Sequence, residues 1–123
     1  MSDGSEVIEA GPHEVSPERA TELVAAGATL IDVRRHYEFE AGHLEGAKNI
    51  EMNELSARAE EIPKETPVVF YCRSGNRSSM AAAAFTEAGY DAHNLAGGIA
   101  AWSAEGRPLE PADGEVAVPL PPS

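Results

Sequence analysis

The chain contains one cysteine, Cys72, and the residues that follow it read Arg-Ser-Gly-Asn-Arg-Ser. A cysteine is a nucleophile only as a thiolate, and nearby cations or a helix N-terminus lower the pKa of its thiol. The segment after Cys72 offers both features, because it carries two arginines and leads into a helix expected from about Asn76 to Ala88. We therefore interpret Cys72 as a catalytic nucleophile beside an anion-binding loop.

The loop after Cys72 is expected to bind an anion through both its backbone and its side chains. Successive N–H groups of a curled loop form an anion-binding nest, and a helix N-terminus adds partial positive charge. Arginines can hold an anionic substrate, serine hydroxyls can donate hydrogen bonds, and a glycine permits the tight turn. Asn76 is also a candidate helix cap. The predicted substrate-binding residues are Arg73, Ser74, Gly75, Asn76, Arg77 and Ser78.

The elements around this loop predict an α/β fold, a parallel sheet covered by helices on both faces. Apolar segments that suit strands alternate with segments that suit helices, and such alternation is typical of a parallel sheet. The expected strands cover residues 13–15, 28–33, 47–50, 68–71 and 91–95, and the expected helices cover 17–26, 53–62, 76–88 and a segment that starts at 98.

Three polar segments are expected to meet at one edge of this sheet. In parallel sheets, ligands bind at the carboxyl ends of the strands. Cys72, residues 32–34 and residues 96–98 each follow an expected strand. Within the second segment, we expect Asp32 and Arg34 to form an ion pair that braces this edge, in preference to Asp32 acting as a general base.

The two ends of the chain differ in composition from its middle. Residues 1–12 are polar, which predicts a flexible N-terminal segment, and residues 106–123 form a proline-rich acidic tail. Within that tail, Val116–Leu120 is the candidate docking segment. The middle, residues 13–105, has the length of one domain.

The charge and the cysteine count exclude several classes of partner. A net charge of −12 argues against nucleic acids and anionic membranes. The histidines lack the spacing of a metal site, and one cysteine cannot complete a zinc centre, so we expect no metal. The N-terminus is acidic, no apolar run could span a membrane, and a single cysteine suits a reducing compartment. These features predict a cytoplasmic protein.

The segment Cys72–Ser78 closely resembles the active-site loop of single-domain rhodaneses, a family of sulfurtransferases. Three further segments resemble motifs of that family in the same order: LIDVR at 30–34, EFEAGHLEGAKNI at 38–50 and NLAGGIAAW at 94–102. The resemblance covers residues 13–105 and implies a rhodanese-like fold with a central five-stranded parallel sheet.

The resemblance also implies an activity. In the family, the cysteine that matches Cys72 takes a sulfur atom from a small anionic donor such as thiosulfate and becomes a persulfide. An acceptor, cyanide or a thiol, then removes that sulfur, and no metal or organic cofactor is needed. Another protein's persulfide could equally be the donor, in a sulfur relay. The sequence leaves open whether the chain is a monomer or a homodimer.

Two other interpretations of the loop are open. Related folds that act as cysteine-dependent phosphatases or arsenate reductases have one residue more than the four found here between Cys72 and Arg77. The shorter loop makes a smaller cradle, better suited to a single sulfur atom than to a tetrahedral phosphate. The chain could also be a non-catalytic rhodanese-like binding module, but such modules usually lack the cysteine that this one keeps.

Overall fold

The computed structural model describes residues 13–118 of the chain. The flexible segment predicted for residues 1–12 therefore lies outside the described residues, as do residues 119–123 of the tail. Between residues 13 and 118, no helix combines the length and the apolar character that crossing a membrane requires.

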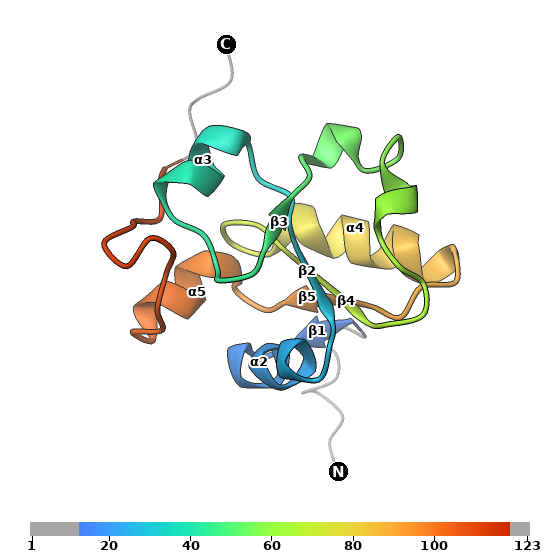
Figure 1. Ribbon diagram of the computed structural model, residues 1–123, viewed down its shortest axis with the longest axis horizontal. Helices are drawn as coiled ribbons and strands as arrows, with labels where there is room; N and C mark the ends of the chain where they lie inside the picture. The colour runs from blue at the N-terminus through green and yellow to red at the C-terminus, as the bar shows by residue number, and fades with distance from the viewer. Residues whose placement is uncertain (1–12, 119–123) are drawn as a thin grey trace.

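The centre of the fold is a five-stranded parallel sheet with the strand order β1-β5-β4-β2-β3 (Figure 1). The central strand β4 (Val68–Tyr71) pairs with both β5 (Ala92–Leu95) and β2 (Thr29–Asp32). The edges are β1 (Glu14–Val15) and β3 (Lys48–Asn49). A parallel strand that is covered on both faces must be apolar throughout, and every residue of β4 is fully buried. The predicted α/β fold is confirmed.

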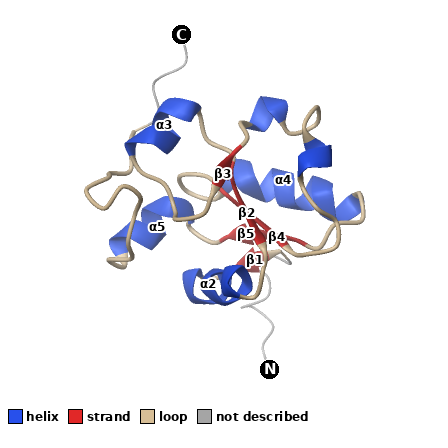
Figure 2. Cartoon of the chain, in the orientation of Figure 1, coloured by secondary structure: helices blue, strands red, loops and turns tan. Residues whose placement is uncertain are grey.

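Helices cover both faces of the sheet (Figures 1 and 2). One face packs against α4 (Asn76–Glu87) and two 3-10 turns, η1 (Met52–Glu54) and η2 (Ala59–Glu61). The opposite face packs against α2 (Pro17–Ala25) and α5 (Gly98–Ala104). The residues that join these elements therefore lie at the two ends of the strands, where a site can form.

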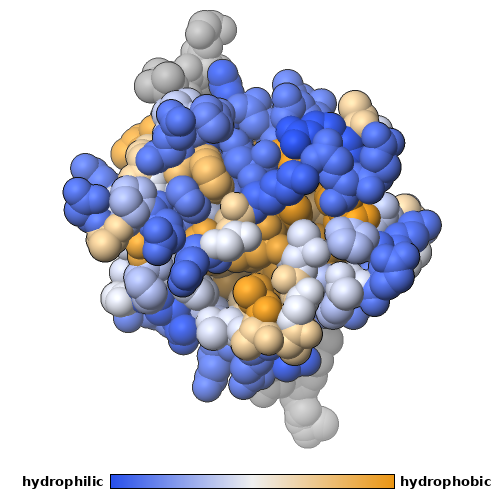
Figure 3. Space-filling model, in the orientation of Figure 1, coloured by the Kyte–Doolittle hydropathy of each residue, from blue (hydrophilic) through white to orange (hydrophobic). Residues whose placement is uncertain are grey.

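Side chains of β4 alternate between two apolar clusters, one on each face of the sheet. Val68 and Phe70 belong to the cluster beneath α4, whereas Val69 and Tyr71 belong to the cluster beneath α2 and α5. Cys72 continues this alternation and lies on the α4 side. On the surface, hydrophilic residues cover most of the face seen in Figure 3, and apolar side chains show in a hollow near its centre.

The single helix predicted from Asn53 to Ile62 is wrong, because this segment forms the separate turns η1 and η2. Arg58 interrupts the helical path with φ −113° and ψ 17°. A helix this short is not stable through propensity alone. The burial of Leu55 and Ile62 against the sheet instead decides the path of the chain.

The segment after α5 packs against the domain beside α3 (His36–Ala41). His43 and Glu110 form an antiparallel bridge, with backbone N–H···O distances of 3.0 and 2.7 Å. Leu109 is buried in the cluster beneath α2 and α5, and Val116 packs against the same cluster. The docked part of the tail thus begins before the candidate segment that the sequence indicates.

Candidate active site

The loop that begins at Cys72 joins β4 to α4 and is held from the other side by the first turn of α5. The N–H of Ile99 donates to the carbonyl oxygen of Cys72, and the N–H of Ala100 to that of Arg73, both at 2.9 Å. Gly98 has φ +62°, and a Cβ there would lie 2.5 Å from both carbonyl oxygens. Only glycine permits this approach, so the glycine pair after β5 allows the predicted convergence of the strand ends.

The thiol of Cys72 is buried and surrounded by hydrogen-bond donors from its own loop. The N–H of Gly75 donates to the sulfur at 3.1 Å, and the hydroxyl of Ser78 lies 3.4 Å from it. Burial by itself would raise the pKa of the Cys72 thiol. The Ser78 side chain and the N–H groups of Ser78, Gly75 and Ser74 outweigh burial and lower this pKa below its ordinary value. The loop therefore favours the nucleophilic thiolate.

Asn94, on β5, anchors this loop, although it is not among the predicted site residues. Its side chain is buried, and Nδ2 donates to the carbonyl oxygen of Gly75 at 3.1 Å and to Glu14 Oε2 at 2.8 Å. Its Oδ1 accepts a hydrogen bond from the Ser78 hydroxyl. One amide thus fixes two positions of the loop. The signal in the sequence was a polar amide within the expected strand 91–95, three residues before the glycine pair that starts at Gly97.

The two arginines of the loop do not donate hydrogen bonds to the thiol among the described residues. Arg77 Nη2 is 3.6 Å from Oε2 of Glu38, whose side chain is fully buried and whose Oε1 accepts the N–H of Arg35 at 3.0 Å. The Nε of Arg73 is buried and has no hydrogen-bond partner among the described residues. The hydrogen bonds to the Cys72 sulfur within residues 13–118 come from backbone N–H groups of the loop and from the Ser78 hydroxyl, not from either arginine side chain. The arginine side chains can therefore serve a substrate.

Ser74 and Asn76 are exposed at the surface of the loop. The expectation that Asn76 caps the helix is wrong, because Gly75 occupies the N-cap position of α4. Gly75 has a left-handed φ of +100°, which other residues resist. Gly75 therefore makes the tight turn and is also the last residue of the loop. Asn76 is the first residue of α4.

Asp32 and Arg34 form the expected ion pair at the end of β2. Both side chains are fully buried, and Arg34 Nη2 lies 2.8 Å from Asp32 Oδ2 while Nε lies 3.0 Å from Oδ1. Arg34 also donates to the carbonyl oxygen of Gly42 at 2.8 Å. Because the arginine engages both carboxylate oxygens in a buried pair, Asp32 is placed to brace the sheet edge.

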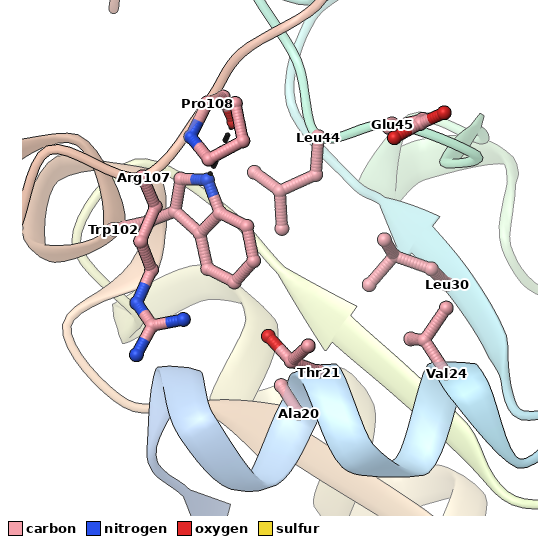
Figure 4. Close-up of a pocket in the computed structure, with 9 residues that line it drawn as sticks. All are labelled: Ala20, Thr21, Val24, Leu30, Leu44, Glu45, Trp102, Arg107 and Pro108. Atoms are coloured by element: carbon pink, nitrogen blue, oxygen red, sulfur yellow. Dashed lines mark hydrogen bonds between the residues drawn. The ribbon is translucent and has the colours of Figure 1, made fainter.

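A cavity of about 260 Å³ lies between α2, β2 and α5 (Figure 4). Its walls are mainly apolar, and the indole N–H of Trp102 donates to the carbonyl oxygen of Pro108 at 2.8 Å along its rim. Leu30 and Leu44 in its wall belong to the cluster beneath α2 and α5, whereas Cys72 belongs to the cluster beneath α4. This cavity therefore lies on the opposite side of the sheet from the thiol.

Comparison with known proteins identifies the family. The model of the Rhodanese-like domain matches residues 16–105. The chain belongs to this family. The rhodanese-like chain is 41% identical over 86 residues to the Sulfurtransferase of Allochromatium vinosum, covering 69% of this chain and 80% of that protein. It is 33% identical over 100 residues to the Thiosulfate sulfurtransferase GlpE of Pseudomonas aeruginosa, covering 80% and 87%.

The chain is also similar to three further proteins. The chain is 43% identical over 76 residues to the protein YqhL of Bacillus subtilis and spans 60% of that protein's length. The Human Single Domain Sulfurtransferase TSTD1 has a TM-score of 0.68 at 32% identity, covering 77% of this chain and 98% of that one. A rhodanese-related protein from Thermoplasma volcanium has a TM-score of 0.75 at 26% identity, covering 80% and 97%. These neighbours confirm the rhodanese-like fold.

Proposed function

We propose that this rhodanese-like protein is a sulfurtransferase that carries a transferable sulfur atom as a persulfide on Cys72. The main support is the buried thiol itself, which receives the N–H of Gly75 at 3.1 Å and lies 3.4 Å from the Ser78 hydroxyl. Hydrogen bonds that lower the pKa of a cysteine increase the fraction present as thiolate, which is the form that attacks sulfur. Kinship to proteins named sulfurtransferases supports the same chemistry.

The first half-reaction loads the enzyme. The Cys72 thiolate attacks the outer sulfur of thiosulfate, an S–S bond to the protein forms, and the S–S bond of thiosulfate breaks. Its electron pair leaves with sulfite, so one bond replaces another and no external oxidant is consumed. The loop N–H groups stabilise the charge on the outer sulfur, and Arg73 and Arg77 hold the sulfonate end of the donor.

The second half-reaction returns the free enzyme. Cyanide or a thiolate attacks the outer sulfur of the persulfide, and the S–S bond to Cys72 breaks with its electron pair on Cys72. The product carries the sulfur away, which gives covalent, ping-pong catalysis. A persulfide on another protein is the second class of donor for the same thiolate. We place this reaction in the cytoplasm, because a free reactive thiol suits a reducing compartment.

Thiocyanate formation from thiosulfate and cyanide tests the proposal. The unmodified protein should produce thiocyanate well above the uncatalysed rate, and a folded Cys72→Ser variant should not. Turnover that survives in this variant would contradict the proposal. Hydrolysis of an aryl phosphate that is lost in Cys72→Ser, without any thiocyanate formation, would favour the phosphatase interpretation instead.

A further inference from the structure

The cavity of about 260 Å³ between α2, β2 and α5 takes no part in the sulfur chemistry, because it lies on the opposite face of the sheet from Cys72. At about 30 Å³ per molecule of liquid water, it corresponds to about nine water molecules, enough space for one aromatic ring with a short side chain. Small-molecule sites have mostly apolar walls and a few polar groups that fix the orientation of the ligand. The walls of this cavity have the same composition.

The apolar wall of the cavity combines buried leucines with one aromatic side chain. Leu30 and Leu44 are buried, and Figure 4 shows the ring of Trp102 directed into the space beside them. The indole N–H of Trp102 already donates to the carbonyl oxygen of Pro108 at 2.8 Å, so the ring offers a ligand only its apolar surface. Aromatic rings gain from packing against one another beyond the area that they bury. This wall therefore favours a ligand with an aromatic ring.

Two polar side chains of the cavity complement a hydroxyl group. The Thr21 hydroxyl donates to the carbonyl oxygen of Pro17 at 2.9 Å, so toward a ligand it can only accept a hydrogen bond. The guanidinium of Arg107 lies 5.2 Å from the centre of the Trp102 ring, and its N–H groups can only donate. In Figure 4 both groups lie below the Trp102 ring. A ligand group that accepts from one and donates to the other is a hydroxyl.

The charges around the cavity favour a neutral ligand. The charge of Arg107 is matched by Glu105, whose Oε1 lies 2.8 Å from Nε. Glu45, also at the cavity, is exposed and has no ion pair within residues 13–118. A carboxylate ligand would meet this uncompensated negative charge and has no proton to donate to Thr21. An ammonium ligand would face the donors of Arg107 with donors of its own.

We propose that this cavity is a second binding site, and that its ligand is a small neutral aromatic molecule with one hydroxyl group, a phenol. The ring of the phenol packs against Trp102 and Leu44. Its hydroxyl accepts a hydrogen bond from the guanidinium of Arg107 and donates one to the Thr21 hydroxyl. The site does not depend on the proposed sulfur transfer, because the thiol lies on the other face of the sheet.

The test uses Trp102 as the reporter, because it is the only tryptophan of the chain and gives a single indole N–H signal in a nitrogen-15 NMR spectrum. The full chain is titrated separately with 4-ethylphenol, 4-ethylbenzoate and 4-ethylbenzylamine, which share their apolar part and differ in the polar group. 4-Ethylphenol should shift the Trp102 signal in a saturable way and at lower concentration than the two charged compounds. In Thr21→Val its affinity should fall about fivefold, the effect of losing one neutral hydrogen bond.

A matched control places the same substitution on the other face of the sheet. Thr86 is an exposed threonine on α4, and Thr86→Val should bind 4-ethylphenol as the unmodified protein does. The absence of a saturable shift of the Trp102 signal would overturn the proposal, as would equal or tighter binding of either charged compound. An affinity for 4-ethylphenol that is unchanged in Thr21→Val, or that falls equally in Thr86→Val, would also overturn it.

Discussion

The Ser78 hydroxyl lies 3.4 Å from the sulfur of Cys72, and both side chains are buried. The same hydroxyl also donates to Oδ1 of Asn94. A serine hydroxyl has one hydrogen, so it can serve only one of these two acceptors at a time. When Cys72 is a thiolate, its negative charge is the stronger acceptor, and the hydroxyl can turn toward the sulfur. Ser78 thus couples the charge of the thiol to the amide that anchors the loop.

Replacing Ser78 with alanine should make the thiol less acidic. The loop lowers the pKa of Cys72, and the Ser78 hydroxyl is one of the donors responsible. Without it the pKa rises, so at neutral pH less of the thiol is a thiolate. The rate of alkylation by iodoacetamide should fall about tenfold, which corresponds to one hydrogen bond to a charged group, and its pH profile should move to higher pH.

Ser79 provides the control for this variant. Its hydroxyl donates to the carbonyl oxygen of Asn76 at 2.9 Å and has no contact with the sulfur. Ser79→Ala should therefore keep the alkylation profile of the unmodified protein. If Ser78→Ala and Ser79→Ala shared the unmodified profile, the assignment of Ser78 as a donor to the thiolate would be wrong.

The buried pair of Asp32 and Arg34 should contribute strongly to stability. Asp32→Asn removes the negative partner and leaves a buried guanidinium without its counter-charge, which costs about 3–5 kcal/mol. Urea unfolding followed by circular dichroism measures this loss. Glu22→Gln breaks the exposed pair with Arg19 and should cost less than about 1 kcal/mol. If Asp32→Asn and Glu22→Gln lowered the free energy of unfolding by similar amounts, the bracing role of the buried pair would be contradicted.

The tail should stabilise the domain through Leu109. This side chain is 9% exposed, whereas Val118 further along the tail is 71% exposed. Leu109→Ala should lower the free energy of unfolding by about 2–4 kcal/mol, because it removes buried methyl groups and leaves a cavity. Val118→Ala should change it by less than about 0.5 kcal/mol. Equal effects of the two substitutions would show that the tail is not docked at Leu109.

The sequence was sufficient to predict the features that local patterns encode. The apolar run of β4 identified a strand buried on both faces. Because neighbouring strands in a parallel sheet run in the same direction, Cys72 and the segment from Asp32 to Arg34, which both follow strands, were expected at the same edge of the sheet. The bidentate contact of that pair, at 2.8 and 3.0 Å, follows from their spacing at a strand end.

Features that depend on contacts between distant residues could not be predicted in the same way. Asn94 reaches Gly75 only because β5 pairs with β4 in one register, in which Phe70 lies beside Asn94. Glu38 is fully buried and its carboxylate folds back onto the N–H of Arg35, although its sequence neighbours Tyr37 and Phe39 are only partly buried. The two turns that replaced the helix from Asn53 likewise reflect packing, which overrides helix propensity in short segments.

Intact mass spectrometry after incubation with a sulfur donor tests the central claim most directly. With thiosulfate, the protein should gain one sulfur atom, peptide mapping should place it on Cys72, and cyanide should remove it. An adduct that forms only with a protein persulfide would identify the relay as the source of sulfur. If neither donor left a sulfur atom on Cys72, or if Cys72→Ser gained the same mass, the persulfide mechanism would be contradicted.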